Sequence, residues 1–143
     1  MSVKQISAFL ENKPGSLKEL ARVLAENGID MRAFSLAEAS DFGIARIIVD
    51  DLYKTTMTLK DAGIIHSVSS VLAVAIPDVP GGLEKVLDVL LQTGSNIEYM
   101  YAFLGARKDE AYMIFKVTGH HKAQDALRAA GIRLVDQEEL AEM

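Results

Sequence analysis

The chain has 143 residues, of which 50% are apolar and 24% are charged, and its 15 basic and 20 acidic side chains give a net charge of −5. This composition excludes intrinsic disorder and low complexity, and the absence of cysteine excludes a disulfide framework, a thiolate metal site and a cysteine nucleophile. The scatter of basic residues among acidic ones argues against a nucleic-acid partner.

The first half of the chain alternates between strand and helix patterns. Residues 3–10 place apolar side chains at alternate positions, which predicts a strand, and the apolar spacing over residues 17–24 predicts an amphipathic helix. Ser16 and Glu19 have the spacing of a capping box at the start of this helix, and Gly28 is placed to end it. The later elements are strands over 33–38 and 43–50 joined by a turn at 40–42, a helix over 52–62 and a strand over 64–70.

The second half of the chain predicts the same order of elements. A strand over residues 71–76 precedes a helix with an apolar stripe, and a hairpin, a second helix and a short strand follow. These elements are the stripe Leu83, Val86, Leu87 and Leu90, the hairpin strands 97–105 and 111–117 with a turn at 107–110, the helix positions Ala123, Ala126, Leu127 and Ala130, and the strand 132–135.

Three landmarks recur in the same order in the two halves, the first two at an offset of 66 positions and the third at an offset of 68. Three ordered matches indicate an internal duplication, which has to be recognised before the fold is assigned. The pairs are 12–17 (NKPGSL) with 78–83 (DVPGGL), 28–31 (GIDM) with 94–97 (GSNI), and 62–64 (AGI) with 130–132 (AGI).

The duplication predicts two units, residues 1–70 and 71–143. Each unit is expected to be a ferredoxin-like βαββαβ unit of the α+β class, with an antiparallel sheet and its helices on one face. Residues 71–76 are apolar on both faces, although a two-layer unit leaves one sheet face to water. Packing of one unit on the other and a homodimer are both open explanations for a covered second face.

No catalytic or cofactor-binding motif is present in the sequence. There is no nucleotide-binding loop, no hydrolase motif and no nucleophile with a base at a suitable spacing. The adjacent His120 and His121 project in different directions from a helix start, and the acidic pairs at 50–51 and 138–139 are typical of a helix start and a solvated acidic tail. We therefore expect no enzyme activity, no metal and no cofactor.

The sequence also predicts that the chain neither crosses nor enters a membrane. Its longest apolar run, residues 71–76, is far shorter than the roughly 20 residues that a membrane-spanning helix needs. The N-terminus lacks the basic start and apolar stretch of a secretory signal. A cytoplasmic location is therefore expected.

The two repeated Pro-Gly loops are candidate ligand sites. Each leads from a strand into a helix N-terminus, where the first backbone amides lack partners and the dipole favours an anion such as a carboxylate. The Ser16 hydroxyl can cap one of these amides whereas Gly82 cannot, so the second loop is expected to be more open. A simple turn is the alternative. The candidate residues are Asn12, Gly15, Ser16 and Leu17 in the first loop and Asp78, Gly81, Gly82 and Leu83 in the second.

A second group of candidates lies at the start of the second strand of each unit. Asp30 with Met31, and Asn96 with Ile97, come just after the glycine that ends the first helix. In a split βαβ unit this strand begins at the end of the sheet opposite the Pro-Gly loop, so the two groups can meet only across an interface between units or chains. An amino acid held there would place its carboxylate on the helix amides and its ammonium group on Asp30 or Asn96. Turn chemistry at a helix exit is the alternative.

This pattern resembles the ACT domain, a small regulatory module of amino-acid metabolism, present as a tandem pair over nearly the whole chain. The second unit is more similar to the family than the first, which has Asn12 where the family usually has Asp and Asp30 where it often has Asn. The residues of the second unit that carry the resemblance are Asp78, Pro80, Gly81, Leu83, Gly94, Asn96 and Ile97.

The resemblance implies a non-catalytic module that binds a free L-amino acid at an interface between ACT units and signals to a partner of amino-acid metabolism. Asp30 and Glu98 favour a polar or heteroaromatic amino acid, histidine included. The main alternative is an interaction module that binds no ligand and docks a metabolic enzyme through its sheet face or edge. An acylphosphatase-like enzyme would need a cationic phosphate clamp in the first loop, where Lys13 is the only basic residue.

Overall fold

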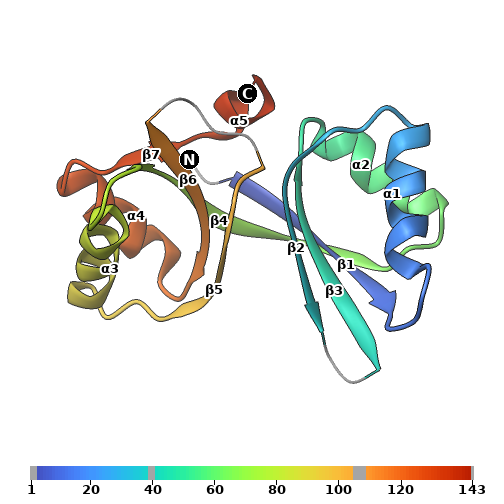
Figure 1. Ribbon diagram of the computed structural model, residues 1–143, viewed down its shortest axis with the longest axis horizontal. Helices are drawn as coiled ribbons and strands as arrows, with labels where there is room; N and C mark the ends of the chain where they lie inside the picture. The colour runs from blue at the N-terminus through green and yellow to red at the C-terminus, as the bar shows by residue number, and fades with distance from the viewer. Residues whose placement is uncertain (1–2, 39–40, 105–108, 143) are drawn as a thin grey trace. The chain divides into compact units, whose positions relative to one another are not determined.

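The computed structural model describes residues 3–38, 41–104 and 109–142. The described chain forms two compact units, Lys4–Ser69, which we call the N-terminal unit, and Ser70–Ala141, the C-terminal unit. Both units have the α+β order predicted from the sequence (Figure 1).

The N-terminal unit begins with a strand and a helix whose ends have clear local causes. Ile6 and Ala8 of the strand lie in the core and Leu10 packs against it, as the predicted periodicity requires. Gln5 and Ser7, at the alternate positions, are buried as well. The helix ends where Gly28 takes a positive φ of 66°, and the amide of Ile29 then donates to the carbonyl of Leu24 over 3.0 Å. The elements of this unit are β1 (Val3–Glu11), α1 (Ser16–Glu26), β2 (Met31–Glu38), β3 (Phe42–Val49), α2 (Leu52–Asp61) and the beginning of β4 (His66–Pro77).

The C-terminal unit repeats this order and adds a short helix at its end. The remainder of β4 is its first strand, so the strands predicted over 64–70 and 71–76 form a single strand. The other elements are α3 (Gly82–Gln92), β5 (Ile97–Ala102), β6 (Glu110–Val117), α4 (His120–Ala129), β7 (Arg133–Val135) and α5 (Gln137–Glu142).

The strands of each unit are ordered as in a ferredoxin-like fold. In the N-terminal unit the order is β2, β3, β1, β4, and in the C-terminal unit it is β5, β6, β4, β7. The pairs β1 with β3, β2 with β3, β4 with β6, β5 with β6 and β4 with β7 are antiparallel. The predicted fold class, two βαββαβ units with antiparallel sheets, is therefore confirmed.

Each unit has its own hydrophobic core between its sheet and its pair of helices. Apolar side chains on one face of the strands meet the apolar stripes of the helices, which is the packing that amphipathic elements require. The buried core of the N-terminal unit contains Ile6, Ala8, Leu20, Leu24, Ile29, Ala45, Ile47, Val49 and Leu59. That of the C-terminal unit contains Leu72, Val74, Ile76, Val86, Leu90, Phe115, Val117, Ala123, Leu127 and Ile132.

The apolar run in β4 is buried on both faces. Leu72, Val74 and Ile76 belong to the core on the helix side, and the alternate side chains of Val71, Ala73 and Ala75 are also buried. This matches the expectation from the two-sided apolar pattern. The two explanations of the covered second face, packing between units and a homodimer, remain predictions.

The end of the chain differs from its prediction. Glu138 and Glu139 were expected in a solvated acidic tail, but they lie in the first turn of α5. The Asp136 side chain accepts a hydrogen bond of 2.8 Å from the amide of Glu139, and Leu140 is fully buried. A capping carboxylate and one anchoring apolar side chain thus order this segment.

Some of the predicted features lie outside the described residues. These are Ser40 in the first hairpin turn, Arg107 and Lys108 in the second, and Gly105 at the end of a predicted strand. Of the helices in the described ranges, none has both the length and the apolar character that spanning a bilayer requires.

Candidate functional site

The two Pro-Gly loops have the same backbone conformation. Gly15 precedes α1 with a φ of 91°, and Gly81 precedes α3 with a φ of 86°. Both values lie in the left-handed region, where glycine is accommodated without the steric cost of a Cβ. In both loops the amide of the first helical residue donates a hydrogen bond to a carbonyl three residues earlier. The Ser16 amide donates to the Lys13 carbonyl over 3.3 Å, and the Gly82 amide donates to the Val79 carbonyl over 3.1 Å.

The predicted capping box at α1 is wrong. The residue that caps the helix is Gly15, and Ser16 is the first helical residue, with no side-chain cap on this helix in the described chain. Glu19 does not reach back to the loop because its carboxylate accepts hydrogen bonds from Arg22, one helical turn further on. This hydrogen bond and the charge of Arg22 lower the pKa of Glu19. The Ser16 hydroxyl therefore does not cap an amide of the first loop. The expectation that such a cap makes the first loop less open than the second is wrong for the same reason.

Both helix starts leave amides available to a ligand. Within the described residues, the amides of Leu17 and Lys18 in α1 and of Leu83 and Glu84 in α3 donate no hydrogen bond. Both Leu17 and Leu83 have side chains that are partly open to solvent. The start of each helix therefore has amides that are free to donate, and the binding of an anion there remains a prediction.

Gly82 has a structural role that the sequence reasoning missed. A Cβ at this position would lie 2.5 Å from the carbonyl oxygen of Pro77 and 2.8 Å from Cγ2 of Ile76. The start of α3 is thus packed directly against the end of β4, and this close approach requires glycine. Ser16, at the matching position of the N-terminal unit, carries a side chain.

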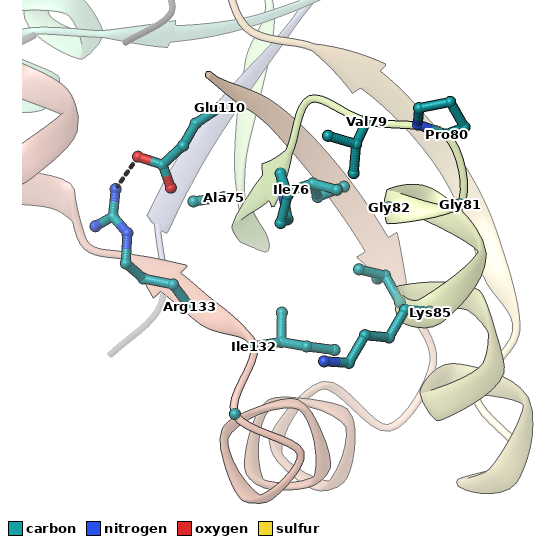
Figure 2. Close-up of a pocket in the computed structure, with 13 residues that line it drawn as sticks. Ala75, Ile76, Val79, Pro80, Gly81, Gly82, Lys85, Glu110, Ile132 and Arg133 are labelled. Atoms are coloured by element: carbon teal, nitrogen blue, oxygen red, sulfur yellow. Dashed lines mark hydrogen bonds and ion pairs between the residues drawn. The ribbon is translucent and has the colours of Figure 1, made fainter. Parts of the chain in front are cut away.

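A pocket of about 400 Å³ lies beside the second Pro-Gly loop, within the C-terminal unit (Figure 2). Its wall is made by the end of β4, the loop, the first turns of α3, the start of β6 and the segment that leads into β7. The lining residues are Ala75, Ile76, Pro77, Val79, Pro80, Gly81, Gly82, Lys85, Val86, Glu110, Gly131, Ile132 and Arg133. We call this space the C-terminal pocket.

The N-terminal unit has a pocket at the matching place, of about 510 Å³. Its residues correspond to those of the C-terminal pocket with the offsets of the sequence repeat. We call it the N-terminal pocket, and it is lined by Phe9, Leu10, Glu11, Lys13, Pro14, Gly15, Ser16, Glu19, Leu20, Gly63, Ile64 and Ile65. In each unit, therefore, the repeated Pro-Gly loop and the repeated Ala-Gly-Ile segment line the same pocket. The Ala-Gly-Ile repeat was a signal for this site that the sequence reasoning used only for alignment.

The two pockets differ in charge. In the C-terminal pocket, the exposed ammonium group of Lys85 has no hydrogen bond or ion pair within the described chain. Across the pocket, Arg133 pairs with Glu110 over 3.4 Å, and Figure 2 shows this pair on the opposite side from Lys85. The residue at the position of Lys85 in the N-terminal pocket is Glu19, so the charge at this point of the repeat is reversed.

Arg133 is held by more than the carboxylate in the pocket. Its Nη1 atom donates to both carboxylate oxygens of Glu139 in α5, at 2.9 and 2.8 Å, and its Nη2 atom donates to the Tyr112 hydroxyl over 3.2 Å. The hydrogen bond with Glu139 is the main cause that raises the pKa of Arg133 above its ordinary value. This guanidinium therefore joins the rim of the pocket to the last helix.

Asp30 and Asn96 lie at the end of the sheet away from the loops, as predicted. In the N-terminal unit, Glu11 pairs with Phe42 near the loop, whereas Met31, which follows Asp30, pairs with Val49 at the other end of β3. In the C-terminal unit, Pro77 pairs with Glu110 and Ile97 pairs with Val117. Within one unit the loop residues and Asp30 or Asn96 are therefore not brought together.

The remaining predicted site residues divide between surface and core. Asn12 and Asp78 are exposed at the ends of their strands, and Asn12, Ser16 and Leu17 line a smaller pocket of about 180 Å³ in the N-terminal unit. Met31 and Ile97 are partly buried and pack against the two cores. Within the described ranges, no group of three or more His, Asp or Glu side chains is placed to hold a metal ion.

The fold and its two repeated loops define a class of small tandem α+β modules. The chain matches the family described as an ACT domain pair over residues 1–143, and it belongs to that family. ACT domains are regulatory modules, and the resemblance seen in the sequence is confirmed.

Solved structures share this fold. A Bacteroides thetaiotaomicron protein of known crystal structure is 37% identical, covers 100% of this chain and 98% of its own, and superimposes with a TM-score of 0.93. The regulatory subunit of aspartate kinase from Thermus thermophilus has the same fold at 19% identity, with 91% of each chain covered and a TM-score of 0.66. The corresponding subunit from Thermus flavus is also 19% identical, with 92% of this chain and 94% of that chain covered and a TM-score of 0.57. A search of curated proteins found no match.

Proposed function

We propose that this ACT pair binds a free L-amino acid and transmits the bound state to a partner of amino-acid metabolism. One observation carries the proposal: in each unit the two repeated loops line one pocket beside a helix start with available amides. Pockets of this size, within the roughly 300–1,000 Å³ typical of small-molecule sites, suit a metabolite. An amino acid brings the carboxylate that a helix N-terminus favours.

The proposed contacts follow from the chemistry of an amino acid. Its carboxylate accepts hydrogen bonds from the amides of Leu83 and Glu84, which the loop from Asp78 to Gly81 leaves accessible. Its ammonium group is held by Asp30 or Asn96 of another ACT unit, as the family resemblance implies. Binding then stabilises one arrangement of the units over others, which is how a module without its own chemistry can act on a partner.

The kind of partner that we propose is a metabolic enzyme. Two solved structures of similar fold are regulatory subunits of aspartate kinase, so a separate regulatory chain of this architecture can serve an enzyme of amino-acid metabolism. A homodimer and a cytoplasmic location are part of the proposal. The preference for a polar or heteroaromatic amino acid such as histidine remains a prediction from the sequence, and Asp30 and Glu98, on which it rests, are paired with Arg32 and Lys116 at 3.1 and 3.6 Å.

A thermal-shift panel of the purified chain against the twenty L-amino acids tests this proposal. A ligand at 100 times its dissociation constant stabilises the folded state by about 2.7 kcal/mol, which raises the melting temperature by several degrees. We expect one amino acid or a small related group to do so, and its D-enantiomer to have no effect. A panel with no selective shift would reject the proposal and leave the ligand-free interaction module, to be sought by its stable complex with an enzyme.

Two matched variants then identify which strand start contributes. We expect Asn96→Ala to remove the ligand-induced shift and Asp30→Ala to leave most of it, because the C-terminal unit matches the family pattern more fully. Both side chains are exposed, so neither substitution is expected to change the melting temperature without ligand. The reverse result would assign the ammonium contact to Asp30.

A further inference from the structure

We infer that the ligand site of this chain is the C-terminal pocket alone, that its ligand is an aliphatic L-amino acid, and that Lys85 is the residue that holds the carboxylate of this ligand. The inference rests on the proposed function. It replaces the polar or heteroaromatic preference predicted from the sequence with an aliphatic one, and it adds the unit that binds the ligand and the side chain that holds its carboxylate.

The lining of the C-terminal pocket determines the class of side chain that fits. Its floor is formed by Ile76, Val86 and Ile132, which are all buried, and Ala75 and Val79 add further apolar surface. The Glu110 and Arg133 pair lies at one side of the pocket, and Lys85 enters from the other (Figure 2). An aliphatic side chain placed on this floor removes apolar surface from water without leaving a polar group unpaired.

The charged groups of the pocket determine where the carboxylate lies. Glu110 and Arg133 already neutralise each other, and Glu110 also accepts a hydrogen bond of 3.1 Å from the Tyr112 hydroxyl. Lys85 has no such partner in the described chain, and Figure 2 shows its ammonium end directed across the pocket toward Ile132. A carboxylate between this ammonium group and the amides at the start of α3 would satisfy both.

The N-terminal pocket lacks this arrangement although it has a similar apolar floor. Glu19 replaces Lys85 at the matching position, and its carboxylate is held by Arg22 in an exposed ion pair. The one lysine in that lining, Lys13, pairs with Glu11 over 3.0 Å. A carboxylate entering there would meet two acidic side chains and no available cation, so we expect one ligand per chain.

Isothermal titration calorimetry of the full chain tests the inference, with L-valine, L-leucine, L-isoleucine and L-histidine as the probes. We expect at least one aliphatic probe to bind with one site per chain, and L-histidine to bind much more weakly. Lys85→Gln should weaken this binding about tenfold or more, since a hydrogen bond to a charged group is lost, whereas Lys85→Arg should retain most of the affinity. Glu19→Gln, at the matching position of the other pocket, is the control and should leave the affinity unchanged.

The outcomes separate this inference from the proposed function. If L-histidine or another polar amino acid is the ligand, or if Lys85→Gln binds an aliphatic amino acid as tightly as the original chain, the inference is wrong and the proposed function stands. Two sites per chain would also overturn it. If no amino acid of the full set of twenty binds, the proposed function and the inference both fail. Lys85 is exposed, so the Lys85→Gln variant is expected to fold, and an unchanged melting temperature without ligand verifies this.

Discussion

Gly82 lies so close to Pro77 that a Cβ on the glycine would be 2.5 Å from the carbonyl oxygen of the proline. This contact sets how the first turn of α3 meets the end of β4, and it therefore positions both the available amides and the wall of the C-terminal pocket. Ser16 occupies the matching place in the N-terminal unit. The duplicated units thus share a backbone path but not the same closeness between helix and strand.

The contact predicts a difference between two small substitutions. Gly82→Ala should destabilise the chain by about 1–3 kcal/mol, because a backbone carbonyl cannot move away as a flexible side chain can. Ser16→Ala removes a hydroxyl that caps no helix and should change the stability by about 0.5 kcal/mol or less. Urea unfolding midpoints of the two variants measure this. Equal and small effects for both would show that α3 can shift away from β4 at little cost.

A second prediction concerns the hydrogen bonds that fix the start of β2 and β5. The Asp30 amide donates to the Asp50 carboxylate over 3.1 Å, and the Asn96 amide donates to the Thr118 hydroxyl over 2.9 Å. In return, the amides of Asp50 and Thr118 donate to the carbonyls of Asp30 and Asn96, at 3.2 and 3.0 Å. The two units therefore fix the start of this strand with the same pair of hydrogen bonds, but the side-chain acceptor is a carboxylate in one unit and a hydroxyl in the other.

Removal of either acceptor should therefore have a similar cost. We expect Asp50→Ala and Thr118→Ala each to lower the free energy of unfolding by about 1 kcal/mol, the typical net value of one hydrogen bond. Thr118→Ser keeps the hydroxyl and is the control. If Thr118→Ser is as destabilising as Thr118→Ala, the methyl group rather than the hydrogen bond accounts for the loss.

The repeat and the element order could be predicted because they are local or periodic properties. The alternation of apolar residues over 3–10 predicts the core-facing side of β1, and the spacing of Leu17, Leu20 and Leu24 predicts one face of α1. The ferredoxin-like strand order then follows, because the rules for connecting strands and helices leave few topologies for a βαββαβ unit. For the same reason, the position of Asp30 at the far end of the sheet was derived correctly without coordinates.

The capping box could not be predicted correctly from spacing alone. Glu19 has two partners at a distance of three residues, Ser16 before it and Arg22 after it, and the sequence does not rank them. The charge of Arg22 makes it the stronger partner. The positive φ of Gly15 then moves the cap one residue earlier than a serine cap would.

The pocket was missed because its charged residues come from separate segments. Lys85 is in α3, Glu110 starts β6 and Arg133 starts β7, and only the pairing of β6 and β7 on either side of β4 brings the last two close to each other. No spacing rule joins three such positions. The short α5 was missed because Leu140 is its one buried side chain, which is too little to produce a helical period.

The ion pair of Glu19 with Arg22 predicts a pH dependence with a defined sign. The hydrogen bond from Arg22, then its positive charge, lowers the pKa of Glu19 in the folded chain. Its contribution to stability is therefore fully present above the ordinary glutamate pKa of about 4.3 and is lost as the pH falls through the lowered folded value. The difference in urea midpoint between the original chain and Glu19→Gln should follow this course. Because the pair is exposed, high salt should reduce the difference at neutral pH, and a difference that grows as the pH falls would contradict the assignment.

Arg133 predicts a link between the rim of the C-terminal pocket and the last helix. It pairs with both Glu110 of β6 and Glu139 of α5, and the buried Leu140 and the Asp136 cap also hold α5. Arg133→Met keeps most of the side-chain length but removes the charge, so the amides of Gln137–Glu142 should exchange with deuterium up to about fivefold faster, which corresponds to a loss of about 1 kcal/mol in local stability. Arg128→Met is the matched control, because the Arg128 side chain, exposed in the last turn of α4, makes no ion pair within the described residues. Equal exchange in the two variants would show that Leu140 and the Asp136 cap hold α5 without Arg133, and that the state of the pocket is not transmitted to the end of the chain through this guanidinium.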